Sequence, residues 1–139
     1  MTGAARPPMP AAPPAIDGSI LFFYYDDLDA AACWYHEVLG LDILMREEWL
    51  VLLQLRPGCT VGLVDATGGN HLPPRGGNQG AMLSIETNQL EAWLERFKVA
   101  GHCPPDTSLI SGCRGRTLEF RVRDPGGYMV EFFHWLDRP

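Results

Sequence analysis

The strongest constraint on the fold is an internal repeat, in which a strand, a helix and three further strands follow one another twice. In the first copy, the aromatic run from Ser19 to Tyr25 predicts a strand, Asp27 can cap the helix that follows, and Gly40 can end it. The buried face of this helix is predicted by apolar residues at helical spacing, namely Leu28, Ala31, Ala32, Tyr35, Val38 and Leu39. Three strand-like segments complete the copy, LDILMRE, EWLVLLQL and TVGLVDA.

The second copy begins with the strand-like run from Gly80 to Glu86. Thr87 or Asn88 can cap its helix and Gly101 can end it, and the buried stripe is Leu90, Trp93, Leu94 and Phe97. A loose stretch then leads to two strand-like segments, RTLEFRVR and GYMVEFFHW. The order of elements therefore matches that of the first copy.

Neither copy is large enough to bury a core alone, so the two are expected to pair. The sequence predicts an α+β fold of two βαβββ modules, related by pseudo-twofold symmetry, that form a barrel-like sheet around a central cavity with the helices outside. The first module spans about 18–65, a Gly, Pro and Asn-rich linker spans 66–79, and the second module spans about 80–135. Residues 1–17 are expected to be a disordered Pro/Ala-rich tail before a single domain, 18–139.

The charge balance narrows the ligand class. The chain has 139 residues, 11 Lys and Arg against 17 Asp and Glu, and a net charge of −6, which argues against a nucleic-acid or anionic-membrane surface. No run approaches the roughly 18 apolar residues that span a bilayer. The four cysteines show no CxxC spacing and no export signal precedes them, so a cytoplasmic protein with reduced thiols is expected. A small molecule or a protein partner is the favoured ligand.

Three stretches, DDLDAAACWYHEVLGLDI, VGLVDA and RDPGGYMVEFF, resemble the vicinal oxygen chelate superfamily. This superfamily includes glyoxalases, fosfomycin-resistance enzymes, extradiol dioxygenases and bleomycin-resistance proteins. The resemblance covers Ser19 to about Trp135 and implies the two-module fold, a small-molecule ligand and a homodimer. It does not fix the function, because this scaffold hosts unrelated chemistries and also binding without chemistry.

The resemblance also implies where a metal would be held. Aligned with the two repeats, the family's four ligand places fall on Ile20, Gly62, Ala81 and Glu131, and only the last can bind a metal. No cofactor is therefore expected, and a divalent metal is disfavoured. Of the histidines, only His71, in the linker, is free to be a substitute ligand, because His134 alternates to the face opposite Glu131.

Glu131 stands in an apolar strand and therefore needs a partner. In the preceding strand-like segment, Leu118, Phe120 and Val122 share one face and Glu119, Arg121 and Arg123 the other. Because the DPGG turn makes these two strands a hairpin, Arg121 is predicted to reach Glu131 and hold it ionised. The pair is either a structural ion pair or part of a ligand site.

Alternation predicts the rest of the inner wall. If Ile20 points inward, so do Phe22 and Tyr24, while Ala81 would bring Leu83 and Ile85 with it. Trp49 lies where bleomycin-resistance relatives also tend to have tryptophan, and an aromatic ring there can stack on a flat ligand. The alternative for each of these residues is ordinary core packing.

Three functions remain open from the sequence. The first is binding of a small, aromatic or partly anionic molecule, with ligand-binding residues Phe22, Tyr24, Trp49, Glu119, Arg121 and Glu131. The second is an enzyme, such as a glyoxalase-like lyase or isomerase or a dioxygenase relative, that uses Glu131 as general acid or base, either without metal or with a non-standard metal site. The third is an interaction or dimerisation domain with a vestigial pocket.

Overall fold

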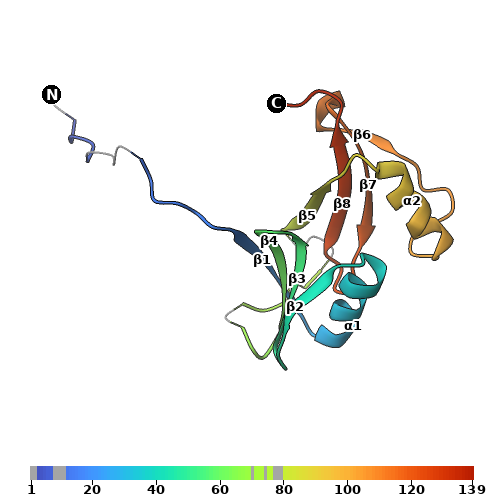
Figure 1. Cartoon of the computed structure of the whole chain (residues 1–139), viewed down its shortest axis with the longest axis horizontal. Coiled ribbons are helices and arrows are strands. Elements are labelled where there is room, and N and C mark those ends of the chain that lie inside the picture. The colour runs from blue at the N-terminus through green and yellow to red at the C-terminus, as the bar shows by residue number, and fades with distance from the viewer. Residues whose placement is uncertain (1–2, 8–11, 70, 74, 77–79) are drawn as a thin grey trace.

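A computed structural model describes residues 3–7, 12–69, 71–73, 75–76 and 80–139. The first module contains β1 (Ser19–Tyr25), α1 (Leu28–Cys33), a π-helical turn (Trp34–Val38), β2 (Asp42–Arg46), β3 (Leu50–Arg56) and β4 (Cys59–Asp65). The second contains β5 (Met82–Glu86), α2 (Leu90–Val99), β6 (Ile110–Gly112), a 3₁₀ turn (Cys113–Gly115), β7 (Thr117–Arg123) and β8 (Met129–Trp135). The predicted order of strand, helix and three strands is confirmed, and β6 lies in the stretch that the sequence left loose (Figure 1).

Each module folds into a four-stranded mixed sheet with the same topology. The strand orders are β1-β4-β3-β2 and β5-β8-β7-β6, in which β1 pairs in parallel with β4, and β5 with β8. The α+β class and the two modules are therefore confirmed. The sheets do not close into a barrel, because no strand pair joins them in the part of the chain that the structure describes.

The two modules are joined through one hydrophobic core on the helix-facing sides of the sheets. Tyr35, Phe97 and Phe132 are fully buried in it, and Phe97 contacts Trp34 of the first module. Phe23 of β1 stacks on Tyr128, with ring centres 4.0 Å apart. Figure 1 shows α1 and α2 on the same side of the sheets, so the opposite sheet faces are left without helices.

The local signals in the sequence explain the helix ends. Asp27 caps α1, since its Oδ1 accepts a 3.0 Å hydrogen bond from the Ala30 amide, and Gly101 adopts the positive φ that ends α2. The predicted cap of α2 is wrong, because Gln89 holds the N-cap position without a side-chain bond. The Thr87 hydroxyl instead accepts the Gln89 amide in a turn before the helix.

A buried carboxylate connects the β7–β8 turn to the first module. Asp124 accepts hydrogen bonds from the Tyr25 hydroxyl at 2.5 Å and the Tyr35 hydroxyl at 2.8 Å, and also from the amides of Gly126 and Tyr128. Burial raises the pKa of Asp124, while these four hydrogen bonds act in the opposite direction. The aspartate of the DPGG turn thus links the second module to the first through hydrogen bonds.

No helix within the described residues is long and apolar enough to span a membrane. Residues 12–17, which precede β1, are exposed and belong to no helix or strand.

Candidate functional site

The sheet faces that point away from the helices carry exposed apolar side chains. On β1, Phe23 and Tyr25 enter the core, while Phe22 is 42% exposed on the other face, together with Ile20. Trp49, which precedes β3, is 45% exposed. The β1 residues that were predicted to face the ligand cavity therefore lie, as a set, on the sheet face away from the core.

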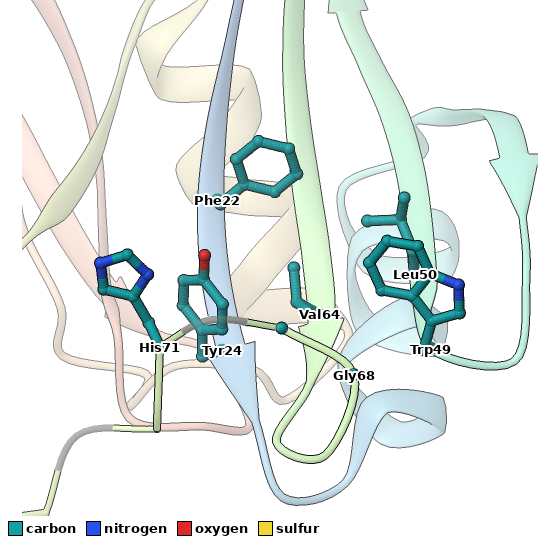
Figure 2. Close-up of a pocket in the computed structure, with 8 residues that line it drawn as sticks. Phe22, Tyr24, Trp49, Leu50, Val64, Gly68 and His71 are labelled. Carbon is teal, nitrogen blue, oxygen red and sulfur yellow. The ribbon is translucent and has the colours of Figure 1, made fainter.

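A cavity of about 740 Å³ lies on this face of the first module and is called the first-module cavity below. Its lining residues are Phe22, Tyr24, Trp49, Leu50, Val64, Gly68, Gly69 and His71. Figure 2 shows the Phe22 and Tyr24 rings projecting from β1, with Trp49 and Leu50 at the start of β3. The structure thus brings together the three aromatic residues that the sequence predicted.

Glycines shape this cavity by letting aromatic rings approach the backbone closely. The Phe22 ring lies over Gly62, where an added Cβ would be 2.6 Å from two ring carbons. At Gly69, an added Cβ would be 2.7 Å from the Tyr24 ring and 2.8 Å from Val64. Side chains at either position would fill the space beside the rings.

The segment predicted as a linker supplies one wall of the cavity. Gly68 packs against the Cβ of Trp49, and the His71 ring lies 5.2 Å from the Tyr24 ring, centre to centre. From the sequence, His71 is considered only as a substitute metal ligand in the linker, and Gly68 and Gly69 are not singled out within it. The paired glycines were an available signal, because such residues often mark a close approach of the backbone.

A second group of predicted residues meets on the sheet of the second module. Arg121 lies directly opposite Glu131 in the β7–β8 hairpin, and its Nε donates a 3.3 Å hydrogen bond to Glu131 Oε2. Its Nη2 donates to Glu119, and this bond is the main cause of the raised pKa of Arg121. The predicted contact between Arg121 and Glu131 is confirmed, and Glu119 is a second partner.

This polar cluster contains two further residues that the sequence interpretation missed. The Ser84 hydroxyl donates a 2.7 Å bond to Glu131 Oε1, and the Thr117 hydroxyl donates a 3.1 Å bond to Glu119 Oε2. Glu119 is only 4% exposed and Glu131 8%, whereas the Arg121 side chain is 46% exposed. The two carboxylates are thus held below the surface and the guanidinium reaches it.

The predicted facing of β5 is wrong by one residue. Ser84, not Leu83 or Ile85, lies beside Glu131, and Leu83 belongs to the core. The reason is the pairing register, because β5 places Ser84 opposite Glu131 just as β1 places Phe22 opposite Gly62, which makes Met82 instead of Ala81 the counterpart of Ile20. A one-residue slip moves every side chain of a strand to the other face.

The predicted site residues therefore form two groups on one chain. Phe22, Tyr24 and Trp49 line the first-module cavity, all of whose lining residues precede β5. Glu119, Arg121 and Glu131 form the polar cluster of the second module.

The residues present do not fit the metal centre that the fold implies. Ile20 and Gly62 have no side-chain donor atom for a metal, Met82, which takes the place of Ala81, has only a soft thioether sulfur, and both oxygens of Glu131 are already hydrogen-bonded. The described residues contain no group of three or more His, Cys, Asp and Glu side chains that could hold an ion. His134 contributes nothing here, because it faces α2 on the side opposite Glu131, as predicted.

Two βαβββ modules with mixed four-stranded sheets define the class as a vicinal oxygen chelate fold. The family model described as "Glyoxalase/Bleomycin resistance protein/Dioxygenase superfamily" matches residues 19–132, and the chain belongs to this superfamily. No curated protein sequence matches the chain.

Solved structures with the same fold include proteins of different function. A lactoylglutathione lyase from Agrobacterium tumefaciens is 25% identical, with a TM-score of 0.64, and the match covers 88% of this chain and 94% of that one. A glyoxalase/bleomycin resistance protein/dioxygenase from Nocardioides is 18% identical, with a TM-score of 0.71 and coverage of 93% and 89%. A bleomycin resistance determinant encoded on the transposon Tn5 is 16% identical, with a TM-score of 0.67 and coverage of 87% and 99%.

Proposed function

We propose that this protein binds a small, flat aromatic or partly anionic molecule in the first-module cavity, without a metal centre and without converting it. The observation that carries the proposal is the aromatic wall formed by Phe22, Tyr24 and Trp49 on a sheet face that no helix covers. Its size supports a small-molecule ligand, because such pockets usually measure about 300–1,000 Å³.

The energetic argument rests on exposed aromatic area. Trp49 and Phe22 each keep more than two fifths of their surface in contact with solvent, and covering such area is favourable by about 25 cal/mol per Å². Stacking of a flat ligand on an aromatic side chain adds about 0.5–1.5 kcal/mol. A planar aromatic compound gains both terms, whereas an aliphatic compound of equal area gains only the first.

The bleomycin resistance determinant supports binding without catalysis only as an example of the fold, since the identity is 16%. The lactoylglutathione lyase has the same fold and is, by its name, an enzyme. The comparisons therefore do not decide between a binding protein and an enzyme. The choice rests on the donor set, because two of the four family ligand places, Ile20 and Gly62, have no metal-binding atom and a third, Met82, has only a soft thioether sulfur.

An enzyme that uses Glu131 as general acid or base is the second candidate, favoured by the position of this buried carboxylate on a helix-free sheet face. Catalysis by Glu131 would require it to exchange a proton with a substrate. Both of its oxygens already accept bonds from Ser84 and Arg121, which favours a structural role.

We further propose that the protein acts as a homodimer in the cytoplasm. A second copy would cover exposed apolar residues of the sheet faces, such as Ile20 and Met82, and so reduce their contact with water. Cys33, Cys59, Cys103 and Cys113 all carry free thiols, which suits a reducing compartment.

A thermal-shift screen tests the binding proposal. Planar aromatic compounds, neutral and anionic, should raise the melting temperature of the parent protein, because a ligand of the folded state stabilises it. Trp49→Ala should abolish the shift, while Ile110→Ala, which truncates an equally exposed residue of the other module, should keep it. An unchanged shift in Trp49→Ala would show that the compounds bind elsewhere.

A further inference from the structure

A second cavity, of about 360 Å³, lies where the two modules meet and is called the seam cavity below. Leu39, Leu41 and Leu55 of the first module form one side, and Ile85, Trp93 and Phe132 of the second form the other. The remaining lining residues are Arg56, Cys59, Ser84 and Glu86. It shares no lining residue with the first-module cavity.

The apolar floor of the seam cavity consists of side chains that pack in or against the core. Phe132 is fully buried and Leu39 nearly so, and the Trp93 and Phe132 rings lie 5.0 Å apart, centre to centre. These side chains are fixed by the core that joins the modules. A ligand would therefore meet a preformed apolar surface, which reduces the entropic cost of binding.

The rim of the cavity carries a positive charge that is not paired with any residue that the structure describes. The Arg56 guanidinium makes no hydrogen bond or ion pair with any residue that the structure describes, whereas the nearby Glu86 carboxylate is paired with Arg138. A second cation, Arg96, lies 5.8 Å from the centre of the Trp93 ring. Its Nε and Nη2 donate to the carbonyls of Val38 and Glu37, and Arg96 does not line the cavity.

Backbone groups of β5 add polar positions beside the apolar surface. β5 is the end strand of its sheet, and the Thr87 amide donates to the Phe133 carbonyl of β8. Because backbone direction alternates along a strand, the amides and carbonyls of Ser84 and Glu86 point to the free edge. This edge can bond a carbonyl or amide of a ligand.

We propose that the seam cavity is a second ligand site, which takes a small aromatic carboxylate or sulfonate. The aromatic part packs on Trp93 and Phe132, and the anionic group pairs with Arg56, whose planar guanidinium suits a two-point contact with an oxyanion. Since both modules line the cavity, the bound molecule stabilises their packing. The proposal does not depend on the function of the first-module cavity.

The test uses the full chain and the fluorescent probe 8-anilinonaphthalene-1-sulfonate, with its neutral analogue N-phenyl-1-naphthylamine. The parent should bind the sulfonate with enhanced fluorescence and energy transfer from tryptophan, at a site that persists when the first-module cavity is disrupted. Arg56→Gln should weaken binding of the sulfonate by about tenfold or more, because a charged hydrogen bond is lost, and should leave binding of the neutral analogue unchanged. Arg56 is exposed, so matching near-ultraviolet circular dichroism will show that the variant keeps its packing.

Two matched variants complete the experiment. Arg114→Gln makes the same charge change next to β6, which lies at the opposite edge of the second-module sheet from β5, and should not alter the affinity. Trp49→Ala, which removes the wall of the first-module cavity, should not alter it either. The proposal would be overturned if Arg56→Gln and the parent bound the sulfonate with equal affinity, or if only Trp49→Ala lost binding of the sulfonate. Failure of the parent to bind the sulfonate would also overturn it.

Discussion

Arg121 Nε lies 3.3 Å from Glu131 Oε2, directly across the β7–β8 hairpin, while Nη2 of the same guanidinium bonds to Glu119. One half-exposed cation thus serves two buried carboxylates. The three residues should therefore contribute unequally to stability. Removal of the cation leaves two buried charges without their partner, whereas removal of Glu131 leaves a cation that still has a partner.

Arg121→Met is therefore expected to destabilise the protein more than Glu131→Gln does. We expect a loss of about 2–4 kcal/mol in the free energy of unfolding for Arg121→Met, and about 1 kcal/mol for Glu131→Gln. Urea unfolding at pH 7 measures both. The double variant should lose less than the sum of the two, because the residues are in contact. Strict additivity, or a larger loss in Glu131→Gln, would show that the pair does not act as described.

The raised pKa of Asp124 predicts the direction in which the stability of the folded protein changes with pH. Burial raises its pKa above the ordinary value of 3.8, so the folded protein binds this proton more tightly than the unfolded chain does. The stabilisation from this proton is complete below the unfolded pKa and is lost as the pH rises through the folded pKa. Asp124→Asn lacks the titrating group, so the stability of the parent relative to this variant should be greatest near pH 3 and should decline as the pH rises.

Urea unfolding of both proteins between pH 3 and pH 7 gives this difference. Asp124→Ala serves as the control, because it leaves two tyrosine hydroxyls and two amides without their acceptor and should lose about 2–4 kcal/mol near neutral pH. A parent advantage over Asp124→Asn that grows with pH would mean that the pKa is lowered by folding.

Gly62→Ala separates ligand binding from stability. The added methyl group would overlap the Phe22 ring, which is exposed and can swing away, so the free energy of unfolding should change by less than about 1 kcal/mol. The displaced ring no longer forms the cavity wall, and affinity for the strongest compound of the thermal-shift screen should fall several-fold. Unchanged affinity would indicate that Phe22 is not a ligand contact.

Addition of nickel, zinc, manganese or iron should leave the melting temperature of the protein nearly unchanged. The reason is the donor set, because Ile20 and Gly62 offer a metal nothing to bind and the soft thioether sulfur of Met82 is a poor ligand for these ions. A rise of several degrees that chelation reverses and that Glu131→Ala lacks would establish a non-standard metal site.

The repeat in the sequence was enough to predict the architecture. Strand and helix periodicity predicted β1, both helices and the β7–β8 hairpin, and the hairpin in turn predicted the contact between Arg121 and Glu131. These features depend on local patterns and on neighbouring strands, which a sequence displays directly. Barrel closure depends on contacts between distant edge strands, and no local pattern specifies them.

The site was predictable only in part for the same reason. Alternation placed Phe22 and Tyr24 correctly because β1 begins where its sequence suggests, but the alignment of β5 with β1 was one residue off and concealed Ser84. The wall formed by Gly68 and His71 depends on how the connection after β4 folds back over β1. The seam cavity exists only after the two modules pack together.

Equilibrium dialysis followed by mass spectrometry of the recovered compound tests the central claim most directly. The compound that gives the largest thermal shift is dialysed against the full chain. It is then released by denaturation of the protein, and its mass is measured by mass spectrometry. We expect saturable binding by the parent, loss of binding by Trp49→Ala, and recovery of the compound with its mass unchanged after prolonged incubation, with or without added divalent metal. Conversion of the compound by the parent but not by Glu131→Gln would contradict the account and identify the protein as an enzyme.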